Sequence, residues 1–455
     1  MDADERRPVL VIATLSAFIT PFSSSALNVA LPQMGTEFSA DGVTLGWIVS
    51  IYQLIAAMFL VPLGRIADIK GRRRIFQWGA WIYGFASLLL TFAPSAVVVI
   101  ALRTAQGLGG AMMFGTGVAL LSSVYPSAER GRALGLNVAA VYSGLSLGPF
   151  VGGFLTQQFG WRSIFFFSAI LGVATAIITT WKLKGEWATA REEEFDFKGA
   201  LLFSATIVAV MLGFSTLPAI HGFGLLGAGI LGLAAFALLE ARIRHPILHV
   251  GLFRNNPVFA FSNLAALLNY CATSAVGFLL SLYLHFAKGL SPQETGMVLV
   301  SQPIVMAIFS PLAGRLSDRI EPRTMASVGM GFSCLGLLVL ANVDAGTSLS
   351  FIVVTLIVLG FGFALFSSPN VNAIMGSVDR TLYGVASGTM GTVRLMGQML
   401  SMGISMSIIA VFIGPVQITP EQGMGLVNAV RVAFLVFGAL CFGGVFASLA
   451  RGKLR

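Results

Sequence analysis

Long apolar runs follow one another along almost the whole chain, with short polar stretches between them. Each run has about 20 residues, the length that lets an α-helix cross the hydrocarbon core of a bilayer. Strands of a membrane barrel would alternate every second residue and would be about half as long. The pattern predicts an all-α membrane protein with fourteen spans, at residues 8–30, 43–66, 75–93, 97–123, 132–156, 161–181, 198–219, 223–240, 257–286, 295–316, 324–343, 347–370, 382–413 and 425–449.

A polar motif at the end of one apolar run returns later in the chain. GRIADIKGRRR at Gly64–Arg74 is matched by GRLSDRIEPR at Gly314–Arg323, 250 residues further on. The repeat indicates two similar halves that face the same side of a membrane. A six-helix half needs roughly 180–200 residues, so the spacing leaves room for one extra helix pair. The predicted units are a six-helix bundle at 1–181, a two-helix insert at 182–256 and a six-helix bundle at 257–455.

The distribution of charge predicts the orientation. The chain has 28 Lys and Arg against 19 Asp and Glu, a net charge of +9, and a mean hydropathy of +0.86. Most basic residues fall in the termini and the even-numbered loops, whereas only Arg162 and Lys288 fall in odd-numbered loops. By the positive-inside rule both termini are cytoplasmic, in a multi-pass protein of the cell membrane. Topology thus accounts for the basic balance, and no nucleic-acid partner is implied.

Other site chemistries find little support in the sequence. All three cysteines lie inside apolar spans and are interpreted as packing residues. We expect no metal site and no cofactor, because no His/Cys cluster has metal-ligand spacing. We also expect no enzyme, since no nucleophile–base pair lies at a common depth.

The two gate segments, Gly64–Arg74 and Gly314–Arg323, place an Asp at the end of one span and Arg at the start of the next. An Asp–Arg lock across such a short loop would hold one conformation closed on the cytoplasmic side. The alternative is ordinary basic flanking of membrane spans. The predicted gate residues are Gly64, Arg65, Asp68, Gly71, Arg72, Gly314, Arg315 and Asp318.

Arg103 and Arg394 lie inside spans, whereas every Asp and Glu falls in a terminus, in a loop or at a helix end. A charge within the membrane costs a few kcal/mol and usually pairs or faces a wet cavity. The alternatives are that Arg103 snorkels to the outer surface and that Arg394 forms a structural pair. A cavity with arginines and no acid favours a neutral or anionic amphiphile.

Polar residues at mid-depth are candidates for the walls of such a cavity, although interhelical hydrogen bonding explains each one singly. They are Asn28, Gln53, Tyr142, Asn269, Tyr270, Gln302 and Gln398. The 36 Phe and 17 Met can supply an adaptable apolar lining suited to a hydrophobic ligand.

Four stretches carry a resemblance to a known family. The first gate segment resembles the GxLxDxxGRR loop signature of the major facilitator superfamily, and residues 102–110 (LRTAQGLGG) are similar to its fourth-helix signature. Residues 144–153 (GLSLGPFVGG) look like the fifth-helix signature of its antiporters. Asn28–Pro32 resembles the end of the first-helix signature of fourteen-span drug:proton antiporters.

The resemblance implies a fold of two six-helix bundles and transport by alternating access. It assigns proton coupling to Arg103, with Gln106 beside it in the same motif. It also implies a bent, closely packed fifth helix at the interface of the halves, built on Gly144, Gly148, Pro149, Gly152 and Gly153. One departure stands out: the family's first-helix signature begins with an Asp five residues before the Asn, where this chain has Ser23.

The sequence therefore predicts a secondary active exporter of amphiphilic or drug-like small molecules, with protons as the implied coupling ion and membrane lipid as its surroundings. We expect a monomer. A flippase for a lipid or lipid precursor, or an organic-anion exporter, remains open on the same fold. A non-transporting sensor would not need the gate and antiporter signatures.

Overall fold

The computed structural model describes residues 3–188, 195–243, 250–317, 319–379 and 382–452. Within these ranges the regular structure is helical, apart from one isolated bridge between Asp41 and Gln417. The first eight helices are α1 (Ala3–Phe38), α2 (Gly42–Lys70), α3 (Arg72–Leu90), α4 (Ala96–Val124), α5 (Ser127–Phe159), α6 (Arg162–Lys182), α7 (Phe197–Thr216) and α8 (Ile220–Glu240). They are followed by α9 (Val250–Asn255), α10 (Pro257–Thr273), α11 (Val276–Leu282), the π-helical turn η1 (Tyr283–Ala287), α12 (Pro292–Leu299), α13 (Ser301–Ser317), α14 (Pro322–Leu340), α15 (Leu349–Gly376), α16 (Tyr383–Phe412), the short η3 (Pro420–Gln422) and α17 (Gly423–Ala450).

Thirteen helical stretches of the described residues are long and apolar enough to cross a membrane. The all-α membrane prediction is confirmed, whereas the count of fourteen spans stays a prediction. The predicted span 75–93 corresponds to α3, which packs between α4 and α6 but opens with three arginines that lower its hydropathy. The predicted span 257–286 consists of α10, α11 and η1, and the Ala275 amide at the first break donates to Ser401 Oγ at 3.0 Å.

Polar residues at helix starts explain several boundaries. The Asp41 side chain accepts from the Thr44 amide at 2.7 Å and begins α2. Ser291 and Glu294 form a reciprocal capping box at the start of α12. These caps fix where the helices begin, at positions where backbone amides need partners outside the helix.

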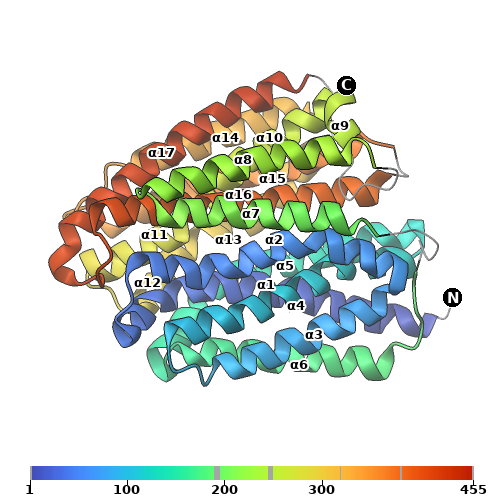
Figure 1. The fold of residues 1–455 in the computed structure, drawn as a ribbon, viewed down its shortest axis with the longest axis horizontal. Coiled ribbons are helices and arrows are strands. Elements are labelled where there is room, and N and C mark those ends of the chain that lie inside the picture. The colour runs from blue at the N-terminus through green and yellow to red at the C-terminus, as the bar shows by residue number, and fades with distance from the viewer. Residues whose placement is uncertain (1–2, 189–194, 244–249, 318, 380–381, 453–455) are drawn as a thin grey trace.

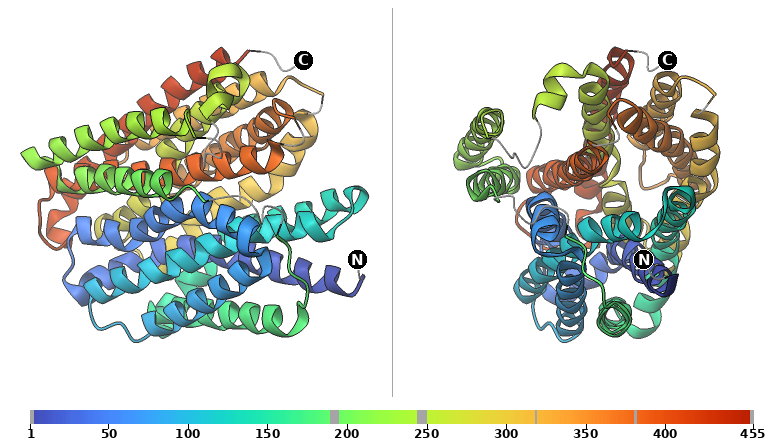
Figure 2. Two further views of the ribbon diagram at one scale, coloured as in Figure 1. Left: turned by 45° about the vertical axis from the view of Figure 1, so that its right-hand side comes forward. Right: turned by 90° about the vertical axis from the view of Figure 1, so that its right-hand side faces the viewer.

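The helices form two packed groups and a separate hairpin. Helices α1–α6 pack on one another, and so do α10–α17, while α7 and α8 pair with each other. Figures 1 and 2 show the two groups side by side, with both chain termini at the same end of the molecule. We call this end the terminal end and the opposite one the distal end. The exact boundaries 1–181, 182–256 and 257–455 remain a prediction.

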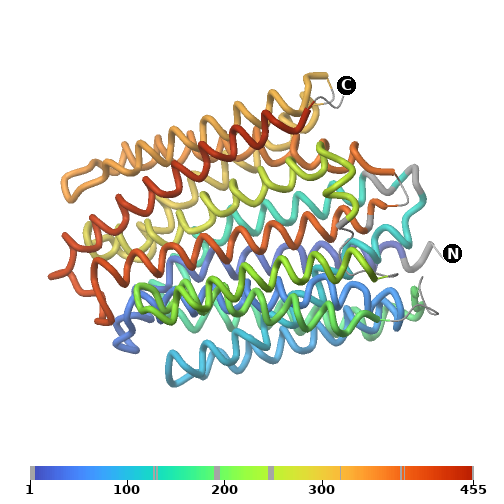
Figure 3. Tube along the Cα trace, turned by 45° about the horizontal axis from the view of Figure 1, so that its top comes forward, coloured from blue at the N-terminus to red at the C-terminus, as the bar shows by residue number. Residues whose placement is uncertain are grey.

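The α7–α8 hairpin lies across the seam between the groups. Helix α7 contacts both α2 and α16, and Figure 3 shows the hairpin running beside them. Buried apolar residues of all three helices form one cluster, made of Leu54, Ala57, Phe203, Ile207, Val210, Met211, Met399 and Met406 together with Phe236 of α8. Near the distal end, Ser407 Oγ donates to the Phe214 carbonyl at 2.6 Å.

Glycines bring the two groups close together in their distal halves. A Cβ on Gly42 of α2 would lie 2.4 Å from Ile409 Cγ2, and one on Gly46 would lie 2.2 Å from Met406 Cγ. Between α5 and α12, a Cβ on Gly296 would lie 2.2 Å from the Pro149 carbonyl oxygen. The distal half of the seam is therefore closed by contacts that leave no room for a side chain.

Candidate functional site

Arg103 of α4 is enclosed in the N-terminal group, with 1% of its surface exposed. Its Nε donates to the Ile48 carbonyl at 3.1 Å, and its Nη1 donates to Gln106 Oε1 at 2.6 Å. The Gln106 side chain extends this hydrogen-bond network by donating from Nε2 to Ser87 Oγ at 2.8 Å. The guanidinium carbon also lies 4.7 Å from the centroid of the Tyr52 ring. The charge is therefore stabilised by neutral acceptors and a ring face rather than by snorkelling to the surface.

Arg394 of α16 is half-buried and faces the other group of helices. Its guanidinium carbon lies 5.4 Å from the centroid of the Phe114 ring on α4. Tyr270 of α10 lies within electrostatic reach of both Arg394 and Tyr142, and its ring meets Phe363 edge-on at 5.7 Å. Arg394 has no ion pair with a carboxylate of the described residues. The sequence-predicted Arg394, Tyr142 and Tyr270 thus come together with aromatic rings from both groups.

The other predicted polar residues are dispersed. Asn28 lies where α1 meets α11, and its carbonyl accepts a hydrogen bond from the Ser281 hydroxyl. Asn269 is fully buried, and its side-chain Nδ2 and Oδ1 have no hydrogen-bond partner among the described residues. Gln53, Gln302 and Gln398 are half-buried on α2, α13 and α16. Together they place polar groups on helices of both halves.

Ser23 occupies the place where the family signature has an acid. It is 1% exposed, and its hydroxyl has no hydrogen-bond partner in the described structure. The Tyr83 hydroxyl of α3 lies beside it. Ser23 is therefore a small, uncharged polar residue near Arg103, with Tyr83 between them in electrostatic reach of Arg103.

The first gate segment joins α2 to α3. Arg72 donates to Asp68 Oδ1 from Nη2 at 2.7 Å and from Nε at 2.8 Å, and its Nη1 donates to the Ser123 hydroxyl of α4. Gly71 connects the two helices with a φ of +116°, a conformation that side chains rarely adopt. Gly64 and Arg65, also predicted as gate residues, are half-buried in the last turns of α2.

The second gate segment follows α13. Asp318 lies outside the described residues, so its pairing stays a prediction. Gly314 and Arg315 occupy the last turn of α13, where the Ser317 hydroxyl donates to the Gly314 carbonyl at 2.7 Å and accepts from Asn372 of α15.

The fifth-helix glycines lie on two contact surfaces of α5. Gly144, Gly148 and Gly152 touch α1, where Cβ atoms would lie 2.4 Å from the Phe18 carbonyl oxygen, 1.8 Å from Ser25 Oγ and 2.6 Å from Ala26 Cβ, respectively. Pro149 and Gly153 instead face α12 across the seam. Ser146 faces α13, where its hydroxyl donates to the Pro303 carbonyl at 3.0 Å.

Comparison with known proteins settles the family. The sequence matches the Major Facilitator Superfamily over residues 13–260 and 262–453. The chain belongs to this family. The riboflavin transporter RibZ of Clostridioides difficile is 27% identical over 444 residues, covering 97% of this chain and 96% of the relative. The multidrug resistance protein Stp of Mycobacterium tuberculosis is 30% identical over 410 residues, covering 89% of this chain and 76% of the relative.

A solved structure of a bacterial homologue of the human lysosomal transporter Spinster, inward-facing and unoccupied, superposes with a TM-score of 0.73. It is 16% identical and covers 99% of this chain and 98% of its own, which shows a shared fold. The chain is thus a Major Facilitator Superfamily transporter in sequence and in fold.

Sequence reasoning missed the partners of the charged groups. Tyr52, which stacks on Arg103, and Phe114, which faces Arg394, carry no signal in the apolar pattern. Arg451, counted by sequence among the basic residues of the C-terminus, is 1% exposed. Its guanidinium donates to Asn370 Oδ1 at 2.9 Å and to the Pro322 carbonyl at 2.8 Å, and so ties α14, α15 and α17 together.

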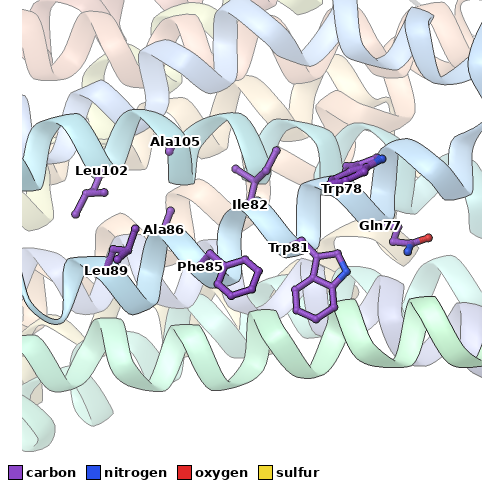
Figure 4. Close-up of a pocket in the computed structure, with 9 residues that line it drawn as sticks. All are labelled: Gln77, Trp78, Trp81, Ile82, Phe85, Ala86, Leu89, Leu102 and Ala105. Atoms are coloured by element: carbon purple, nitrogen blue, oxygen red, sulfur yellow. The ribbon is translucent and has the colours of Figure 1, made fainter.

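One surface hollow lies away from the Arg394 region. It is a groove of about 610 Å³ on the outside of the N-terminal group, between α3 and α4 (Figure 4). Its lining is Gln77, Trp78, Trp81, Ile82, Phe85, Ala86, Leu89, Leu102 and Ala105. Trp78 and Phe85 are 60% and 53% exposed, which suits contact with the acyl chains of the membrane.

Proposed function

We propose that this transporter exports amphiphilic, drug-like small molecules by alternating access, driven by protons. The observation that carries the proposal is the Arg394 region, where Phe114 and Tyr270 lie beside a half-buried cation between the two helix groups and Tyr142 lies within electrostatic reach of Tyr270. Aromatic rings with few convergent polar groups suit planar, partly apolar ligands. Relatives named as a multidrug efflux pump, a tetracenomycin exporter and a riboflavin transporter support the same class of cargo.

The proposed orientation places the terminal end in the cytoplasm. The loops and termini at this end hold most of the Lys and Arg residues, as the positive-inside rule requires. Toward this end of the seam, Gly64 of α2 and Gly388 of α16 have no described atom within 4 Å of a Cβ position. Together with the closed distal half, this supports an inward-facing state, in which cargo reaches the Arg394 region from the cytoplasm or the inner leaflet.

Proton coupling belongs to the proposal through the buried polar chain of Arg103, Gln106 and Ser87. A buried charge held by neutral acceptors is sensitive to any proton or ligand charge that arrives near it. Tyr52 links the two regions, because it stacks on Arg103 and lies within electrostatic reach of Arg394.

An organic-anion exporter is the second candidate. Arg394 has no carboxylate partner among the described residues, and Ser23 replaces the first-helix acid of the family signature. A cavity with an uncompensated cation attracts anions and repels cationic drugs.

The test uses purified protein in proteoliposomes with an imposed pH gradient and three fluorescent probes: the cation ethidium, neutral riboflavin and the anion fluorescein. The proposal expects gradient-dependent movement of at least one probe and its loss in Arg394→Gln. The matched control is Arg431→Gln, because Arg431 is an exposed arginine near the distal end of α17. Selective movement of fluorescein would favour the anion candidate, and movement of no probe under any gradient would contradict both.

A further inference from the structure

The segment between α6 and α7 lies directly on the first gate segment. We call residues Leu183–Trp187 the strap. Leu183 is fully buried, and Trp187 packs partly buried on the core of the N-terminal group. One turn before the strap, Thr180 of α6 accepts a hydrogen bond from Gln77 of α3 at 3.1 Å. The strap is therefore anchored to the same group of helices as the gate segment.

The strap supplies the partners that the first turn of α3 lacks. Gly71 precedes α3 and has no side chain to cap it, so the first amides of the helix need acceptors from elsewhere. The Arg72 amide donates to the Trp187 carbonyl at 2.8 Å, and the Arg73 amide donates to Glu186 Oε1 at 3.0 Å. Glu186 thus acts as an N-cap from another segment, with its negative charge at the positive end of the helix dipole.

The approach of the strap also explains the glycine of the gate signature at this place. A Cβ on Gly71 would lie 2.3 Å from the Glu186 carboxyl carbon. The Arg73 guanidinium closes the contact from the other side by donating to the Lys184 carbonyl at 3.2 Å. The exposed Glu186 carboxylate is therefore held against the gate backbone, while the neighbouring Lys184 carbonyl is held by the Arg73 side chain.

The strap is continuous with the hairpin that crosses the seam. Helix α7 begins at Phe197, ten residues after Trp187, and near the distal end it rests on α16, where Ser407 bonds the Phe214 carbonyl. The hairpin thus contacts the C-terminal group near its distal end and is joined through the chain to the strap at its terminal end.

We propose that Glu186 is a positioning residue of the gate. It fixes the first turn of α3, and through it Arg72 and Asp68, and it tethers the α7–α8 hairpin to the N-terminal group. The inserted hairpin then has a role in the transport cycle: it connects the gate loop of one group to α16 of the other. Only the kinetic consequence of this role rests on the proposed function, since the contact itself is independent of cargo.

The experiment compares Glu186→Ala, Glu186→Gln and a control, Glu129→Ala, in the full-length protein. Glu129 is another exposed acid at the terminal end, paired with Arg6 at 3.4 Å and away from the first gate segment. Hydrogen–deuterium exchange reads the amides of residues 70–76 directly. Loss of the acceptor in Glu186→Ala is expected to speed this exchange about tenfold, while Glu186→Gln, which keeps an acceptor oxygen, changes it by no more than about threefold.

Transport kinetics then distinguish a positioning role of Glu186 from a general loss of protein stability. In Glu186→Ala, turnover is expected to fall about fivefold with KM unchanged within about twofold, because the gate is remote from the Arg394 region. Thermal stability and exchange elsewhere should match the control. Unchanged exchange at 70–76 in Glu186→Ala overturns the proposal, as does a change in KM with turnover intact. If neither the parent nor any variant transports a probe, the proposed function is contradicted. The exchange result still tests the positioning role of Glu186 in that case.

Discussion

Replacing Gly296 with Ala tests whether the distal half of the seam is a moving contact. The added Cβ would lie 2.2 Å from the Pro149 carbonyl oxygen and 3.4 Å from Gly153 Cα. The first distance is roughly 1 Å inside a normal van der Waals contact, and the atom it meets is backbone, so no rotamer change relieves the clash. Overpacking of this kind costs about 1–3 kcal/mol, which corresponds to about 5- to 150-fold in a conformational equilibrium.

The cost applies only while α5 and α12 are in contact, so Gly296→Ala should shift the protein away from the inward-facing state. The intrinsic gain of alanine in a helix, about 0.5–1 kcal/mol, is the same in both states and cancels. The matched control is Gly331→Ala on α14, a helical glycine with no described atom within 4 Å of its Cβ position.

The assay is a spin-label distance measurement across the distal end. Labels at Gln158 of α5 and Asn342, just after α14, occupy exposed positions in opposite groups, and the native cysteines are buried. Gly296→Ala should increase the population with a long label–label distance, whereas Gly331→Ala should match the parent. A distance distribution identical to the parent in Gly296→Ala would refute the idea that this seam opens during the cycle.

Three further predictions follow from buried groups. Arg451→Met removes the bonds to Asn370 and to the Pro322 carbonyl, so the protein should lose about 2–4 kcal/mol of stability, seen as a lower melting temperature in detergent. Gln106→Leu leaves Arg103 Nη1 without its acceptor and should reduce proton-driven transport at least about tenfold while ligand binding persists; equal rates would contradict the coupling role. Ser23→Ala should leave transport unchanged because the Ser23 hydroxyl carries no charge and binds no proton, whereas Ser23→Asp should add proton release when ethidium binds, measured in weak buffer.

The all-helical membrane fold could be predicted from sequence because the chain alternates between long apolar runs and short charged loops. The same pattern predicted the place of the α7–α8 hairpin, since the two gate segments lie 250 residues apart. Arg103 and Arg394 were predicted as site residues because burying a charge at membrane depth costs free energy that usually has to be offset by a functional or structural partner. These inferences depend on depth and spacing along the chain, which a sequence records directly.

Side-chain partners could not be predicted for a physical reason. In a water-soluble helix the apolar stripe shows which face is buried, but in a membrane both the lipid face and the packed face are apolar. The rotation of α4 that places Arg103 against Ile48 and Phe114 against Arg394 is therefore not encoded in hydropathy. The strap was missed for a related reason: Glu186 lies in a charged stretch that looks like a solvated loop, and only the folded chain shows it capping α3.

The central claim is that a pH gradient drives cargo through the Arg394 region. The most direct measurement follows fluorescein and ethidium in proteoliposomes while the pH gradient is imposed and then collapsed, for the parent protein and for Arg394→Gln. The account predicts movement of a probe that stops when the gradient collapses and that is lost in Arg394→Gln. Transport that continues unchanged after the collapse, or that is as fast in Arg394→Gln as in the parent, would contradict it.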